Sequence, residues 1–148
     1  EGSRADLGAL LGNHSAGDHV YCCGPDAYMQ SVMDAAEAGG FPEDARHLEY
    51  FAVPEMPEYE NHPFELELKD GRVLPVAEDQ NAAAVLQGAG FKIDIKCSDG
   101  ICGVCKCGVL EGEVEHRDFV LSGKQRETSF ISCQSRAAEP GGRIKIDI

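Results

Sequence analysis

The first third of the chain combines short apolar runs with one helical pattern. Residues 19–23 (His-Val-Tyr-Cys-Cys) predict a buried strand that the Gly24-Pro25 pair ends. Apolar side chains recur at helical spacing over residues 26–38 before Gly39-Gly40, and Pro25 suits the first helical position. Residues 47–52 predict a second strand. The result is a β–α–β fragment whose two strands cannot cover both faces of their own sheet.

Residues 53–63 interrupt these patterns. The stretch holds three prolines and three glutamates, a composition typical of a stiff, extended linker. We therefore expect residues 1–52 and residues 64–148 to fold on either side of a linker at 53–63.

Strand alternation begins at Phe64. Residues 64–68 alternate apolar and polar side chains, and residues 69–72 (Lys-Asp-Gly-Arg) carry a turn signal before a second strand at 73–76. Pro75 has no backbone N–H group and therefore favours an edge position for that strand. The two strands are predicted to form a hairpin.

A helix and further strands follow this hairpin. Asp79 is a candidate N-cap for a helix that runs to Ala89. Residues 106–110 predict a strand, residues 111–113 a turn, and the alternation over residues 143–148 a final strand. A hairpin, one helix and further strands in this order indicate an α+β fold.

Charge separates the same two parts of the chain. The 148 residues carry a formal net charge of −13. Residues 1–63 hold 12 acidic and 2 basic residues, a net charge of −10, whereas residues 64–148 hold 14 and 11, a net charge of −3. We expect no nucleic acid partner, because phosphates need a basic surface. No apolar run approaches the roughly 18 residues of a membrane span, so we expect no membrane partner either.

Four cysteines carry the clearest chemical signal. Their spacing is C-x4-C-x2-C followed by a distant fourth cysteine, which is the plant-type pattern for a [2Fe–2S] cluster. Thiolates are soft ligands that suit iron–sulfur clusters, and Gly100 and Gly103 allow the positive φ angles that a compact ligand loop needs. We therefore predict that the metal ligands are Cys97, Cys102, Cys105 and Cys133.

Other uses of the cysteines fit the sequence less well. Structural zinc sites usually pair two C-x2-C knuckles, whereas this chain has one. Disulfides need an oxidising compartment, the sequence begins without an apolar signal segment, and seven cysteines is an odd number. We expect free thiols and a cytoplasmic setting. Cys107 lies two residues beyond Cys105 and is expected to be a small buried side chain rather than a ligand.

The cysteine motif is part of a wider resemblance over residues 18–148. The chain resembles the ferredoxin domain of the phthalate dioxygenase reductase family, which includes the vanillate demethylase and carnitine monooxygenase reductases. The family comprises single-chain reductases of two-component Rieske oxygenases, with a flavin domain, an NAD domain and a ferredoxin domain in that order. The segments that carry the resemblance are Cys97–Cys105 (Cys-Ser-Asp-Gly-Ile-Cys-Gly-Val-Cys), Gly112, His116–Asp118 and Ser132–Ala137.

The resemblance implies a domain for each part of the chain. Residues 64–148 are expected to be a β-grasp [2Fe–2S] ferredoxin domain, and residues 1–52 the C-terminal remnant of an α/β NAD-binding domain. The triplet Cys23-Gly24-Pro25 is similar to the family's motif at the carboxyl end of a nicotinamide-domain strand, so these three residues are implied to bind cofactor. The sequence shows neither a glycine-rich phosphate motif nor a flavin domain. We therefore expect a piece of a longer or split reductase, with FMN or FAD and NAD(P)H bound only in the parent protein.

The function that the resemblance implies is one-electron transfer. In such a reductase NADH reduces the flavin, and the [2Fe–2S] cluster passes single electrons to a Rieske-type oxygenase component. The implied partners are this oxygenase and the flavin/NAD portion of the same reductase. The parent would be an NAD(P)H-dependent oxidoreductase, and this chain its electron carrier with no catalytic residue of its own. Two alternatives stay open: a zinc-stabilised interaction module, and one piece of a split NADH oxidoreductase.

Overall fold

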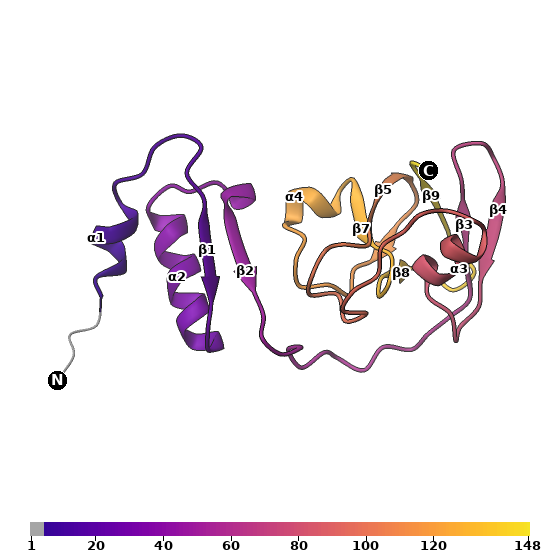
Figure 1. Ribbon diagram of the computed structural model, residues 1–148, viewed down its shortest axis with the longest axis horizontal. Helices are drawn as coiled ribbons and strands as arrows, with labels where there is room; N and C mark the ends of the chain where they lie inside the picture. The colour runs from indigo at the N-terminus through magenta and orange to yellow at the C-terminus, as the bar shows by residue number, and fades with distance from the viewer. Residues whose placement is uncertain (1–4) are drawn as a thin grey trace. The chain divides into compact units, whose positions relative to one another are not determined.

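The structure, a computed structural model, describes residues 5–148 and divides into two compact units (Figure 1). The first unit ends at Ala52 and the second spans Val53–Ile148. The helices are short: α2, with 13 residues, exceeds the other labelled helices in length. Within residues 5–148, no helix combines the length and the apolar character that crossing a membrane requires.

The first unit is a β–α–β motif with a short additional helix. Strand β1 (Val20–Cys23) pairs in parallel with β2 (Arg46–Glu49), and α2 (Asp26–Ala38) connects them. A 3₁₀ turn, η1 (Glu43–Ala45), leads into β2, and α1 (Leu7–Leu11) packs against α2.

The core of the first unit lies between α2 and one face of the strand pair. Met29, Val32 and Ala36 share one face of α2 and are buried in a cluster with Val20 of β1. This spacing, three to four residues apart, is why the segment forms an amphipathic helix. On the other face of β1, Tyr21 is 67% exposed. One side of the two-stranded sheet is therefore covered and the other is open to solvent.

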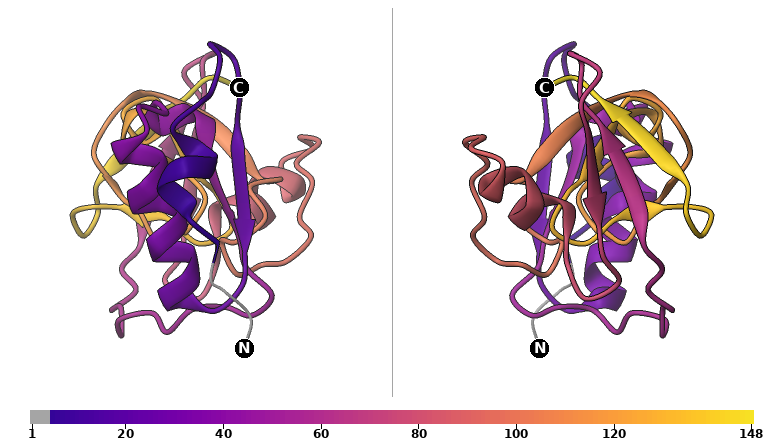
Figure 2. Two further views of the ribbon diagram at one scale, coloured as in Figure 1. Left: turned by 90° about the vertical axis from the view of Figure 1, so that its left-hand side faces the viewer. Right: turned by 90° about the vertical axis from the view of Figure 1, so that its right-hand side faces the viewer.

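The second unit is built on a five-stranded mixed sheet with the order β4-β3-β9-β5-β7. Strand β3 (Phe64–Glu67) runs antiparallel to β4 (Val73–Val76) and parallel to β9 (Arg143–Ile146), as the right-hand view of Figure 2 shows. Strand β5 (Lys106–Glu111) then runs antiparallel to both β9 and β7 (Ser129–Ile131). The segment from Val53 to Phe64, which leads into this sheet, belongs to the second unit as well.

Short elements complete the second unit. Helix α3 (Ala82–Gly88) and the single turn α4 (Gly123–Arg126) lie in the connections, and β6 (Val114–Glu115) pairs with β8 (Arg136–Ala137). The main core packs side chains of α3 against the sheet. Its buried members include Phe64, Leu66, Leu68, Val76, Ala82, Leu86, Phe130, Ile144 and Ile146.

The hydrophobic pattern predicted several elements at their observed positions. The helix at residues 26–38 and the strand at 73–76 are confirmed, and β4, which contains Pro75, is an edge strand. The α+β class of the second unit is confirmed as well, since a mixed sheet is combined with α3. Local polar–apolar patterning is thus sufficient to predict the position of a helix or strand that buries one whole face in the core.

Three predicted details are wrong. The strand predicted at 47–52 ends at Glu49, because its partner β1 ends at Cys23, the residue opposite Glu49. The N-cap of α3 is Asn81 rather than Asp79, and the Asn81 side chain accepts a hydrogen bond from the N–H of Ala84 at 2.8 Å. Pro25 is the N-cap of α2 and precedes the first helical residue.

Gly112 offers a test of this sheet. Its φ is +102°, and a Cβ there would overlap the carbonyl oxygen of Arg143 and lie 3.1 Å from the Cα of Ile144 in β9. We predict that Gly112→Ala destabilises the second unit by about 2–5 kcal/mol, through left-handed backbone strain and overpacking. Native-state hydrogen exchange of the β3 and β9 amides measures the change.

Gly71→Ala is the matched control for this substitution. Gly71 also has a positive φ, +86°, but no heavy atom lies within 4 Å of the position of its Cβ. Its cost should therefore be the backbone term alone, about 1–2 kcal/mol. Equal losses for the two variants would show that the contact between Gly112 and β9 does not matter.

Candidate iron–sulfur site

Three of the four predicted ligands lie on one loop between α3 and β5. The loop turns sharply at Gly100 and Gly103, which have φ angles of +73° and +71°, as their predicted role requires. Ser98 also has a positive φ, +60°, a conformation that is uncommon for a residue with a side chain. These turns hold Cys97, Cys102 and Cys105 within one compact segment.

The fourth predicted ligand comes from the end of β7. Strand β5 pairs with β7, and Lys106 lies opposite Ile131. Beyond this pairing, the hydroxyl of Ser132 donates to the carbonyl oxygen of Cys105 at 2.7 Å, and the Ser132 N–H donates to the same oxygen at 3.2 Å. The two hydrogen bonds place Cys133 beside Cys105, although the two residues are far apart in sequence.

The four sulfur atoms form two pairs. The Sγ atoms of Cys97 and Cys102 are 3.2 Å apart, and the thiols of Cys105 and Cys133 share a hydrogen bond. All are free thiols, with no disulfide between them. Within residues 5–148, no three His, Cys, Asp or Glu side chains converge on a single metal-ion position.

This donor set fits a [2Fe–2S] cluster better than a single zinc ion. A tetrahedral zinc site needs four ligands around one centre. A [2Fe–2S] cluster is held by four cysteines shared between two irons, so it needs two pairs of thiolates. The pairs Cys97/Cys102 and Cys105/Cys133 match that requirement.

The surroundings of the loop favour thiolates. Burial opposes ionisation of Cys97, but N–H groups of Asp99, Ile101 and Cys102 that point at its sulfur outweigh burial and lower its pKa. The N–H of Asp99 lies 3.4 Å from that sulfur. Backbone N–H groups directed at a sulfur also stabilise the negative charge of a bound cluster.

The thiols of the inner pair, Cys105 and Cys133, are coupled through their hydrogen bond. The hydrogen bond from Cys133 lowers the pKa of Cys105 to about 6, and the same contact, together with burial, raises the pKa of Cys133. Cys105 is therefore the first of the two to ionise. A bound cluster would need Cys133 as a thiolate as well, because a metal-bound cysteine is deprotonated.

The two sulfur pairs differ in their exposure. Cys105 and Cys133 are buried in an apolar cluster with Ala83, Leu121 and Ile131. Cys97 is half-buried and Cys102 is exposed. A cluster held by all four would thus have one side in the protein interior and the other at the surface.

A second, supporting loop, which contains Arg117 and Phe119, packs against the ligand loop at Gly100. The N–H of Phe119 donates to the carbonyl oxygen of Gly100 at 3.1 Å. A Cβ at Gly100 would lie 2.9 Å from the carbonyl oxygen of Arg117, so this position admits only glycine without movement of one loop. The contact explains why Gly100 is needed for close packing as well as for its φ angle.

A buried carboxylate fixes the supporting loop. Asp118 accepts hydrogen bonds from the N–H groups of Val120 and Leu121, at 3.2 and 2.9 Å. The Nδ1 atom of His116 is 3.6 Å from the other oxygen of Asp118. Burial lowers the pKa of His116, because the imidazolium form loses its hydration. The His116–Asp118 run, which is one of the segments that carry the family resemblance, thus fixes this loop.

Cys107 lies in the main core rather than with the four predicted ligands. It is buried, it packs in the same cluster as Phe130, and its thiol donates to the carbonyl oxygen of Cys105 at 3.7 Å. Burial raises the pKa of Cys107. This side chain is therefore a small buried thiol, as its sequence position suggested.

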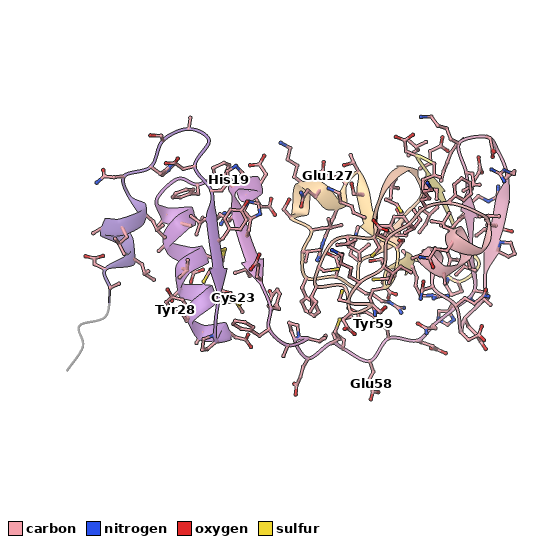
Figure 3. The ribbon with its side chains drawn as sticks, viewed as in Figure 1. His19, Cys23, Tyr28, Glu58, Tyr59 and Glu127 are labelled. Carbon is pink, nitrogen blue, oxygen red and sulfur yellow. The ribbon has the colours of Figure 1, made fainter. Side chains whose placement is uncertain are left out.

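The triplet Cys23-Gly24-Pro25 lies in the first unit. Cys23 is the last residue of β1, and the turn through Gly24 and Pro25 leads directly into α2. Figure 3 shows Cys23 and Tyr28 near this carboxyl end of β1. A Cβ on Gly24 would lie 3.1 Å from the ring of Tyr28. The three residues thus occupy the edge of a parallel strand pair where open α/β sheets bind ligands.

Two buried arginines near the site had no distinct signal in the sequence. Arg117 and Arg136 are only 6% and 5% exposed. Arg136 lies over the ring of Phe64 at 4.9 Å and donates to the carbonyl oxygens of His62, Ala77 and Gln80. Both lie in segments that carry the family resemblance, but burial of an arginine depends on distant partners that no local pattern marks.

Comparison with known proteins gives the same assignment. The family described as "2Fe-2S iron-sulfur cluster binding domain" matches residues 66–138. A vanillate O-demethylase oxidoreductase of Pseudomonas sp. (strain HR199 / DSM 7063) is 37% identical over 137 residues, which is 90% of this chain and 43% of that protein. The chain thus spans less than half the length of this curated relative.

Solved structures show the same similarity in three dimensions. The structure of phthalate dioxygenase reductase matches with a TM-score of 0.64 and 31% identity, covering 98% of this chain and 44% of that one. An intact type IV self-sufficient cytochrome P450 monooxygenase matches with a TM-score of 0.65 and 34% identity, covering 99% and 19%. The chain therefore carries a 2Fe-2S iron–sulfur cluster binding domain at residues 66–138 and is similar along nearly its whole length to part of phthalate dioxygenase reductase.

Proposed function

We propose that this chain carries single electrons through a [2Fe–2S] cluster bound by Cys97, Cys102, Cys105 and Cys133. The observation that carries the proposal is the arrangement of these sulfurs in two pairs, one buried and one at the surface. When bound, such a cluster accepts and releases one electron at a time. The residues of this chain hold it, shield its inner side and leave its outer side accessible.

The proposed donor is a reduced flavin, FMN or FAD, that NAD(P)H reduces in the parent reductase. In that protein, Cys23, Gly24 and Pro25 would contribute to the nicotinamide site. Two features support this part of the proposal: the position of the triplet at the carboxyl end of β1, and the similarity of the whole chain to reductases.

The proposed acceptor is a Rieske-type oxygenase component in the cytoplasm. Two relatives are named phthalate dioxygenase reductase and carnitine monooxygenase reductase subunit, and a third is named vanillate O-demethylase oxidoreductase. The first two names support an oxygenase as the partner. The chain is also similar to part of a self-sufficient cytochrome P450. A haem protein is therefore the second acceptor to test. Stopped-flow oxidation of the reduced protein by a Rieske oxygenase, a cytochrome P450 and cytochrome c compares them directly. Transfer to the Rieske oxygenase no faster than to cytochrome c would contradict this choice of partner.

We predict about two irons and two sulfides per chain, with visible absorbance and a reduced-state EPR signal. Cys133→Ala should abolish the absorbance and destabilise the second unit, because Cys133 comes from a distant segment and ligation is linked to folding. Iron and sulfide analysis and the visible spectrum test the prediction. A colourless parent protein that holds zinc would support the interaction module instead.

Cys107→Ser is the companion variant and should keep the cluster. Its thiol packs in the main core, away from the two sulfur pairs, so iron content should match the parent. Burying a hydroxyl in this core should lower the free energy of unfolding by about 1–3 kcal/mol. A loss of half the iron in this variant would show that the ligand set is wrong.

The surface at the tip of the ligand loop should be the docking site for the acceptor. Ile101 is half-buried and Val104 is 38% exposed, beside the exposed Cys102. We predict that Ile101→Ser and Val104→Ser each slow electron transfer to the oxygenase by about fivefold, as for a residue in a small, transient interface. Salt should affect the rate only modestly, since residues 64–148 have a net charge of −3.

Val73→Ser is the matched control for the docking prediction. Val73 is also 38% exposed, but it lies on the edge strand β4. Its rate of electron transfer should equal that of the parent. A steep salt dependence in the parent, or equal losses at Val73 and Val104, would show that docking does not depend on the apolar tip of the loop.

A further inference from the structure

Arg117 connects the linker to the loop that supports the ligand cysteines. Its guanidinium lies over the ring of Tyr59 at 4.4 Å. Its Nη1 donates to the side-chain oxygen of Asn61 at 2.6 Å, and its Nη2 donates to the carbonyl oxygen of Glu60 at 3.1 Å. Its Nε donates to Glu115 at 2.7 Å. Three consecutive linker residues are thus held by one side chain.

The energetics of this side chain depend on the linker. Arg117 is only 6% exposed, and a buried charge is costly unless hydrogen bonds and a counter-charge compensate it. Glu115 supplies the counter-charge, and residues 59–61 supply the other contacts. A planar guanidinium can stack and donate in several directions at once, which lysine cannot do.

The backbone of Arg117 contacts both segments that carry the ligands. Its carbonyl oxygen packs against Gly100 in the ligand loop. Its N–H donates to the hydroxyl of Ser135 at 3.1 Å, two residues beyond Cys133. The same residue therefore holds the linker with its side chain and the cysteine segments with its backbone.

The attachment continues along the linker as far as β3. Arg136 donates to the carbonyl oxygen of His62 at 2.8 Å, and the N–H of Gly141 donates to the carbonyl oxygen of Pro63 at 2.8 Å. Figure 3 shows Glu58 and Tyr59 leaving the linker on opposite sides. Glu58 is exposed, whereas Tyr59 is half-buried beneath Arg117. Residues 59–63 are thus part of the second unit.

Residues 53–58 also belong to the second unit, and Pro54 and Met56 are half-buried there. Unlike residues 59–63, they form no hydrogen bond, ion pair or ring contact with any of residues 5–148. Because Arg136 and Gly141 hold His62 and Pro63 separately, loss of the Arg117 contacts would leave residues 53–61 free. At roughly 3.5 Å per extended residue this segment would span about 32 Å, whereas residues 53–58 span about 20 Å. Anchoring by Arg117 therefore shortens the free tether by about a third.

We propose that Arg117 is a positioning residue that anchors Tyr59–Asn61 to the ferredoxin domain and so sets the length of the free tether. A shorter tether raises the effective concentration of the domain near the unit to which it is joined. The effect of a shorter tether on electron delivery rests on the proposed function. The anchoring of the linker by Arg117 does not.

Limited proteolysis with chymotrypsin tests the anchoring on the metal-loaded chain. The bond after Phe51, which is 92% exposed, serves as the internal reference. In the parent, cleavage after Tyr59 should be much slower than cleavage after Phe51. In Arg117→Lys and Asn61→Ala, the rate of cleavage after Tyr59 should rise about tenfold, the ratio expected for losing a hydrogen bond to a charged group. The rate of cleavage after Phe51 should change by less than about twofold.

Two controls separate anchoring from general unfolding. Arg72→Lys changes another arginine that lies over an aromatic ring, Phe91, and pairs with a carboxylate, but does not touch the linker. Asn61→Ala changes only the linker side of the contact, so its visible spectrum should equal that of the parent. Small-angle X-ray scattering should give a larger radius of gyration for Asn61→Ala than for Arg72→Lys.

Two results would overturn the anchoring. One is cleavage after Tyr59 at the parent rate in both Arg117→Lys and Asn61→Ala. The other is cleavage after Tyr59 in the parent as fast as after Phe51. A parent protein without the visible spectrum of a [2Fe–2S] cluster would count against the proposed function alone, because the cleavage ratio does not depend on electron transfer.

Discussion

The position of Cys133 beside Cys105 is the constraint on which the second unit depends. The contact joins segments that are far apart in sequence, and three layers of structure maintain it. Pairing of β5 with β7 brings the segments together, Ser132 continues that pairing by two hydrogen bonds to the Cys105 carbonyl, and the N–H of Ala83 in α3 donates to Ser132. The ligand loop, helix and sheet therefore form one cooperative structure around the sulfurs.

The sequence predicted the parts of the site that are local. Spacing pointed to four cysteines that the structure brings together in two pairs. Gly100 and Gly103 could be assigned positive φ because a short loop with three predicted ligands must turn sharply. The helix at residues 26–38 was predictable because its buried side chains recur at helical spacing. These features depend on neighbours a few residues away, which a single sequence displays directly.

The remaining features depend on distant partners. The end of β2 is set by where β1 ends, and β6 and β8 have only two residues each, too few for a periodic pattern. Burial of Arg117 and Arg136 depends on carbonyl groups and rings contributed by residues 59–64 and, for Arg136, also on the carbonyl groups of Ala77 and Gln80. Nothing in the local sequence of either arginine distinguishes it from an exposed one. Long-range hydrogen bonding is thus the information that sequence reasoning lacks here.

The two edges of the five-stranded sheet have a consequence for self-association. A protein with the proposed role of electron carrier must present its surface to partners repeatedly without pairing permanently with another copy of itself. Strand β4 ends the sheet on one side, and Pro75 removes a donor from it; β7 ends it on the other side with only three residues. Neither edge offers a long row of free N–H and C=O groups for another strand to join. The domain is therefore protected against edge-to-edge aggregation by its own edge strands.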